Sequence, residues 1–245
     1  MHEISIKAEH LFNLFGWPIT NTILLALAAS VVLLVLGFDL KSRIQLIPGK
    51  LQGLFEMIIE EVLSLMKNIL GDDKMAEKYL PLIATIFLFV LTSNWLGLLP
   101  LGSIMYHHAP MFRSPASDLN FTLAIAIISV VAANLIGVIV IGWKAHLSKF
   151  FTLKNPVFTF VGLLEFISEF VKIISFSFRL FGNVFAGEVL LVIIGFLVPY
   201  FVPLPFLVLE LFVGMIQAFI FAMLTLVFIG MAVEHHEEPD RPGAH

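Results

Sequence analysis

The chain has 245 residues, of which 59% are hydrophobic and only 13% are charged. Soluble domains carry about 25% charged residues, so this composition indicates an integral membrane protein. A net charge of -4 gives no reason to expect nucleic-acid binding, and a chain with no cysteine can form neither disulfides nor thiolate metal sites. The apolar runs are long and unbroken, unlike the alternating strands of a membrane barrel, so we expect one all-α membrane domain over residues 1–245.

The first apolar run, residues 19–38, has about the twenty residues that a helix needs to cross a bilayer. Basic residues follow it at Lys41, Arg43 and Lys50. Residues 51–70 differ, because acidic side chains recur there on one helical face and apolar side chains on the other. This pattern predicts an amphipathic helix at the membrane interface.

Two further conventional spans are predicted over residues 80–101 and 119–143. Lysines cluster just beyond the second of these spans, in residues 144–154. The positive-inside rule puts this segment and the basic residues 41–50 in the cytoplasm, which leaves the N-terminus outside.

The next apolar run, residues 157–198, would be about 60 Å long as one helix, roughly twice the hydrocarbon thickness of a bilayer. It must form either two short spans or one steeply tilted helix, and we expect the tilted helix. A proline-rich corner then leads to the last run, residues 206–233, which completes a hairpin. Such a hairpin returns the C-terminal tail to the cytoplasm.

Arg179 lies inside the long run, where a permanent charge costs roughly 2.5 to 3.5 kcal/mol on insertion scales. Such residues almost always face a partner or a water-filled path. On a continuous helix Glu165, Lys172 and Asn183 fall within about 40° of Arg179, so acid, base and amide share one stripe. The stripe predicts an ion pathway with Arg179 as its central residue.

Small residues run beside this stripe at spacings that let another helix approach closely. They are Ser168, Ser175, Gly182 and Ala186. We therefore expect this face of the helix to meet a partner.

Acidic residues lie on both sides of Arg179 along the helix. Glu165 and Glu169 precede it, toward the predicted cytoplasmic side, and Glu188 follows it on roughly the opposite face. Arg179 would then divide an inner acidic region from an outer one.

The last helix carries Glu210 and Gln217 seven residues apart on one face. Folding the hairpin should bring Glu210 to the level of Glu188, and Gln217 to the level of Asn183. A carboxylate held in such a polar seam can accept and release protons near neutral pH.

Structural roles are open for several of these residues. Glu165, Glu169 and Lys172 could form a buried ion-pair cluster, and membrane amides often act as interhelical glue. The histidine pairs at residues 107–108 and 235–236 lack further ligands at metal spacing, so no metal site is expected. No phosphate loop, metalloprotease motif or nucleophile elbow is present, so we expect no cofactor, no bound nucleotide and no enzyme activity of the chain alone.

Three short motifs carry a resemblance to a known family: Arg179-Leu-Phe-Gly-Asn183, Ala186-Gly187-Glu188 and Gln217-Ala-Phe-Ile-Phe221. Together they resemble subunit a of the rotary (F-type) ATP synthase membrane sector. The similarity is strongest over residues 165–236, and residues 115–122 also resemble the loop before the family's middle span.

The resemblance implies a stator subunit that conducts protons through two offset half-channels to and from a ring of c subunits. It implies that Arg179 faces the ring carboxylate and blocks leakage, with Asn183 and Gln217 as its polar neighbours. Glu188 matches the acid of the outer half-channel, and Glu165 matches a carboxylate of the inner one. Peripheral-stalk b subunits and a multi-pass location in a bacterial-type plasma membrane are implied as well.

Two positions depart from the family pattern. Several bacterial relatives carry His where this chain has Glu210, and some carry an acid where this chain has Gly97. The outer relay here would then use two carboxylates that titrate as a coupled pair.

Two other functions are compatible with the same polar seam. The chain could be an autonomous secondary ion-coupled transporter, although no repeat between its halves is evident, as many such transporters have. It could also be a membrane scaffold whose charges only pair helices.

Overall fold

The computed structural model describes residues 9–14, 16–42, 44–99, 105–106, 109–150 and 156–234. Its elements in chain order are β1 (His10–Leu14), β2 (Trp17–Thr20), α1 (Asn21–Ser42), α2 (Lys50–Leu70), α3 (Asp73–Leu98), β3 (Met105–Tyr106), β4 (Ala109–Pro110), η2 (Pro115–Ser117), α4 (Leu119–Ile141), α5 (Trp143–Phe150), α6 (Pro156–Leu197) and α7 (Pro203–Glu234).

The all-α membrane fold is confirmed. Five helices, α1, α3, α4, α6 and α7, are long and apolar enough to cross a bilayer. Within the described ranges, the strands form only two short antiparallel pairs, β1 with β2 and β3 with β4. The histidine pairs at residues 107–108 and 235–236, where no metal site was expected, lie outside the described residues.

Local signals set the start of α3, the second predicted span, and the end of α4, the third. Asp72 caps the start of α3, where its side chain accepts a hydrogen bond from the Lys74 backbone N–H at 2.9 Å. α4 ends before Gly142, whose φ of +92° turns the chain into α5. The sequence pattern placed the end of this span at residue 143 and did not predict α5 as a separate helix.

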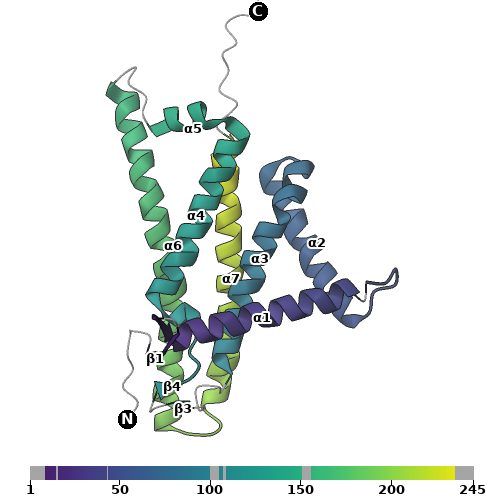
Figure 1. Ribbon diagram of the computed structural model, residues 1–245, viewed down its shortest axis with the longest axis vertical. Coiled ribbons are helices and arrows are strands. Elements are labelled where there is room, and N and C mark those ends of the chain that lie inside the picture. The colour runs from purple at the N-terminus through teal and green to yellow at the C-terminus, as the bar shows by residue number, and fades with distance from the viewer. Residues whose placement is uncertain are drawn as a thin grey trace, which may run out of the picture.

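The long apolar run forms one continuous helix, α6, of 42 residues. It is followed by the Pro203 start of α7, where proline fits because the first helical N–H has no partner in the helix. Figure 1 shows α6 and α7 close together near this connection and apart at their far ends, with α5 beside the far end of α6. The tilt of this hairpin in a bilayer stays a prediction.

The core lies where α7 packs against α3, α4 and α6. Gly137 on α4 makes the close approach to α7 possible, since a Cβ there would come within 2.9 Å of the Ala232 Cβ. α2 packs against α3 and buries Val62 and Met66, in agreement with its amphipathic pattern.

α1 is oriented differently from the other apolar helices. Figure 1 shows it running across the direction of α3, α4, α6 and α7. Its role as the first span, and the interfacial position of α2, therefore stay predictions of length and hydropathy.

Candidate ion path

A polar cavity of about 40 Å³ lies between α4, α5, α6 and α7, and we call it the inner cavity. Its lining residues are Val130, Ala133, Asn134, His146, Glu165, Glu169, Lys172, Phe228, Met231 and Ala232. The three α6 side chains share a face because they follow one another at intervals of four and three residues. Glu165, Glu169 and Lys172, which the sequence pattern singled out, are thus brought together.

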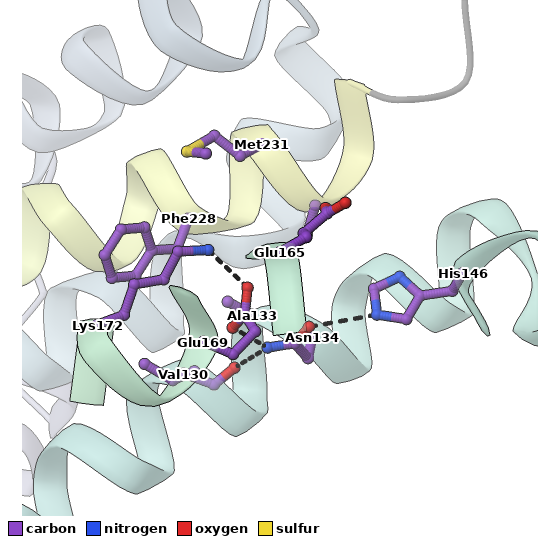
Figure 2. Close-up of a pocket in the computed structure, with 10 residues that line it drawn as sticks. Val130, Ala133, Asn134, His146, Glu165, Glu169, Lys172, Phe228 and Met231 are labelled. Carbon is purple, nitrogen blue, oxygen red and sulfur yellow. Dashed lines mark hydrogen bonds and ion pairs between the residues drawn. The ribbon is translucent and has the colours of Figure 1, made fainter. Parts of the chain in front are cut away.

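The Glu169 carboxylate is the centre of a hydrogen-bonded chain in this cavity (Figure 2). Lys172 Nζ donates to its Oε1 at 2.6 Å, and Asn134 Nδ2 donates to its Oε2 at 2.9 Å. His146 Nε2 lies 3.2 Å from Asn134 Oδ1, so the chain extends from α6 through α4 to α5. The Lys172 ammonium also lies 4.9 Å from the centre of the Phe228 ring, a favourable cation–π distance.

Sequence reasoning missed Asn134 and His146. Asn134 is an isolated amide within a strongly apolar run, which is a detectable signal because buried amides require partners. His146 stands between two lysines in a segment that looks like a polar loop, and nothing in that pattern indicates that its side chain is buried.

A second cavity, the outer cavity, has a volume of about 130 Å³ and lies near the α6–α7 connection. Its lining residues are Asn94, Gly97, Leu98, Ser114, Val184, Glu188, Leu191, Val192, Glu210 and Gly214. Asn94 Oδ1 and Ser114 Oγ are buried there without a protein partner among the described residues. Buried polar atoms of this kind are the usual anchors of ordered water.

The hairpin brings Glu188 and Glu210 to the same cavity, as the sequence pattern predicted. Glu210 is buried, and its carboxylate packs directly on the backbone of Gly187, where a Cβ would overlap all three carboxyl atoms. Across the cavity, Asn94 Nδ2 donates to the Gly214 carbonyl oxygen at 3.1 Å. Two glycines therefore allow polar side chains to approach the helix backbones closely.

Arg113 is a further residue at this site, and the sequence analysis did not identify it. Its Nε donates to Glu188 Oε1 at 3.1 Å and to Oε2 at 3.4 Å. The Arg113 side chain is 8% exposed and that of Glu188 is 35% exposed. Arg113 precedes η2 and lies outside any periodic segment, so the sequence pattern contained no indication of its direction.

Arg179 lies on the outward face of α6, at a level between the two cavities. Along the axis it is about 10 Å from Lys172 and about 13 Å from Glu188, at 1.5 Å per residue. Arg179 and Asn183 are exposed, and no hydrogen bond or ion pair joins Arg179 to another residue in the described ranges. The small residues predicted to receive a partner are exposed on α6 as well: Ser168, Ser175, Gly182 and Ala186.

Gln217 is in a different environment from Asn183. It is buried on α7, on the same side as Glu210 and Gly214, as the spacing predicted. Asn183 is exposed, and within the described part of the chain no hydrogen bond links the two amides. The hairpin thus does not join Asn183 to Gln217 directly.

An apolar layer separates the two cavities. Phe176 on α6 stacks on Phe221 of α7 with ring centres 4.6 Å apart, and Leu180 and Ala218 are buried. The inner and outer cavities have no lining residue in common. We call these four residues the apolar layer.

Comparison with known proteins identifies the family. Residues 20–230 match the family model described as ATP synthase A chain. A protein named ATP synthase subunit a from Mycobacterium tuberculosis (strain CDC 1551 / Oshkosh) is 34% identical over 247 residues, covering 96% of each chain. Proteins of the same name from Gloeobacter violaceus and Campylobacter concisus are 37% and 34% identical, covering 85% of this chain and 82% and 88% of theirs. The chain therefore belongs to the ATP synthase A chain family and is a multi-pass membrane subunit of the rotary ATP synthase, a family that transports protons.

Proposed function

We propose that this chain conducts protons through two offset half-channels, one containing the inner cavity and the other the outer cavity. A proton would pass from the outer cavity to a carboxylate on a ring of c subunits and leave through the inner cavity after the ring turns. The separation of the two cavities by the apolar layer is the observation that supports this proposal most directly.

The position of Arg179 supports its role as the barrier between the half-channels. Its guanidinium does not deprotonate in proteins, so it attracts an arriving ring carboxylate in the ionised form. That attraction makes the carboxylate release its proton on one side before it reloads from the other. Moving one charge through 100 mV supplies about 2.3 kcal/mol, and offset access converts this energy into rotation.

The exposed face of α6 supports a c ring as the partner. A Cβ at Gly182 would meet nothing within 4 Å, and small residues leave room for a second helix beside Arg179. Peripheral-stalk b subunits would hold the chain as a stator. The positive-inside rule supports an outside N-terminus and a cytoplasmic C-terminus in a bacterial-type plasma membrane.

Replacing Arg179 by Ala tests this mechanism. We expect the Arg179→Ala variant to lose coupled ATP synthesis in membrane vesicles while allowing passive proton leakage, because the barrier charge is absent. The measurement is ATP formation and proton leakage under the same imposed gradient.

Lys41→Ala is the control, since Lys41 is also an exposed cation but lies on α1, away from both cavities. It should synthesise ATP at the normal rate. Normal synthesis by Arg179→Ala would rule out the proposed mechanism.

An autonomous secondary transporter is the alternative function. Such a protein would transport ions after purification and reconstitution into liposomes without any other subunit. A stator subunit should be inactive under those conditions, because the moving carboxylates belong to the ring.

A further inference from the structure

His146 is the one titratable side chain that α5 contributes to the lining of the inner cavity. It is 5% exposed, although α5 lies outside the five apolar helices. The half-channel proposal assigns it no role. Its ring nevertheless reaches the hydrogen-bonded chain that is centred on Glu169 (Figure 2).

The bonds of Asn134 determine which nitrogen of His146 carries a proton. Asn134 Nδ2 already donates to the Val130 carbonyl at 3.0 Å and to Glu169 Oε2 at 2.9 Å. The atom that faces His146 Nε2 is therefore the amide oxygen, which only accepts. His146 Nε2 must be the donor in both charge states, so the proton that the imidazole gains or loses is on Nδ1.

We propose that His146 is a pH-sensitive positioning residue of the inner half-channel, acting through Asn134 on the Glu169 carboxylate. Resting on the function proposed above, this inference adds a regulatory group to the same path. When the buried Nδ1 takes a proton, the Nε2–H···Oδ1 bond becomes charge-assisted and stronger. The polarised amide then donates more strongly to Glu169, because bonds in a chain reinforce one another.

Charged side chains surround the hydrogen bonds that join His146 to Glu169, so a proton gained by His146 changes the electrostatic environment of the inner cavity. From α6, Glu165, Glu169 and Lys172 line the cavity, whereas the lining residues of α4 and α7 carry no charge. On α5 itself, the neighbouring Lys144 is exposed at the surface of the protein. A positive imidazole would strengthen the hydrogen bond that orients the Glu169 carboxylate toward the departing proton, and a neutral imidazole would strengthen it less.

Substituting His146 by Gln separates this role from a structural one. Glutamine keeps an N–H donor for Asn134 Oδ1 but does not titrate. ATP-driven proton pumping by the whole complex is measured in membrane vesicles while the pH is varied only on the face where α5 lies. Dividing the rate of each variant by that of the unchanged complex at each pH removes the pH dependence of ATP hydrolysis.

We expect the His146→Gln ratio to change by about twofold or more between pH 5 and pH 8, the range in which imidazole titrates. The His10→Gln variant is a matched control, because His10 Nε2 also pairs with an asparagine, Asn13 Oδ1 at 2.8 Å, but at an exposed site on β1. Its ratio should be constant with pH.

A constant ratio for His146→Gln, with Arg179→Ala behaving as expected, would overturn this inference and leave the half-channel proposal intact.

Asn134→Leu gives a second measurement. It cuts the link to Glu169, so the double variant with His146→Gln should have the same pH ratio as Asn134→Leu alone. An additional pH effect of His146→Gln in that background would overturn the route through Asn134.

Discussion

Glu188 is held by a cation that its own helix does not supply. Arg113 contacts both oxygens of this carboxylate and is almost completely buried in doing so. Glu210, on the same cavity, has no cationic partner in the described ranges and instead packs on Gly187. The two carboxylates that the resemblance implies as a relay thus have different electrostatic environments.

Removing Arg113 should therefore destabilise the folded complex. In Arg113→Ala the Glu188 charge would be left partly buried without its counter-ion. A fully buried broken pair costs about 3–5 kcal/mol, and the 35% exposure of Glu188 reduces the expected loss to about 1–3 kcal/mol. The measurement is the thermal unfolding midpoint of the detergent-solubilised complex.

The control for this prediction is Lys67→Ala. Lys67 lies 3.6 Å from Asp73 and 3.8 Å from Glu77, whose side chains are 75% and 65% exposed. Exposed pairs of this kind contribute less than about 1 kcal/mol. An equal fall in the midpoint for both variants would show that Arg113 acts no differently from a surface cation.

At the scale of the element, α6 has two faces with separate tasks. One face buries Phe176, Leu180 and Val184 at intervals of four residues against the rest of the protein. The other leaves Arg179 and the small residues uncovered. A face with small side chains and one fixed charge is suited to a partner helix that carries a carboxylate, because it permits a close approach.

A bulky residue on this face should block the partner without unfolding the chain. In Gly182→Leu the new side chain enters open space in this chain but would overlap a ring helix. Overpacking costs about 1–3 kcal/mol, and each 1.4 kcal/mol weakens association about tenfold. We expect normal amounts of the variant in membranes and at least a several-fold loss of co-purifying c subunit.

Gly195→Leu is the matched control on the same helix. A Cβ at Gly195 also meets nothing within 4 Å, but this residue lies close to the α6–α7 connection and on a different side of the helix. The Gly195→Leu variant should co-purify with a normal amount of c subunit. Loss of the c subunit from both variants would argue against a specific contact face at Gly182.

At the scale of the whole molecule, α6 and α7 line a cavity on each side of the apolar layer, together with α4 and α5 on one side and α3 on the other. α6 and α7 converge at their connection and separate toward α5, as Figure 1 shows. The wider end admits Asn134 and His146 from α4 and α5, and the closed end receives Arg113 and Asn94. Each half-channel would thus be built from several elements.

The absence of native cysteine makes this arrangement testable from each side of the membrane. Met231→Cys would put a thiol on the inner cavity and Val192→Cys one on the outer cavity. Silver ion binds thiolate, which forms only where water is present. We expect silver to inhibit proton pumping of each variant from one face only, and from opposite faces in the two cases.

Val171→Cys is the corresponding control, because Val171 is exposed on α6 but lines neither cavity. It should be insensitive to silver from both faces, as should the unchanged chain. Inhibition of the Met231 and Val192 variants from the same face would contradict two cavities that open to opposite sides.

The sequence by itself determined the helical spans and the faces of α6. Each apolar run must satisfy its backbone hydrogen bonds within its own helix, so length and hydropathy are enough to identify it. Periodicity likewise indicated that Arg179, Asn183 and the small residues share a region of α6, and that Glu188 points away from them.

Only the tertiary structure decided which groups meet these residues. Glu188 pairs with Arg113, 75 positions away, and Glu169 with Asn134, 35 positions away. Periodicity assigns a residue to a face of its own helix, but it does not specify which element packs on that face. For the same reason the apolar layer, and the burial of His146 against the inner cavity, depend on long-range packing that no local pattern encodes.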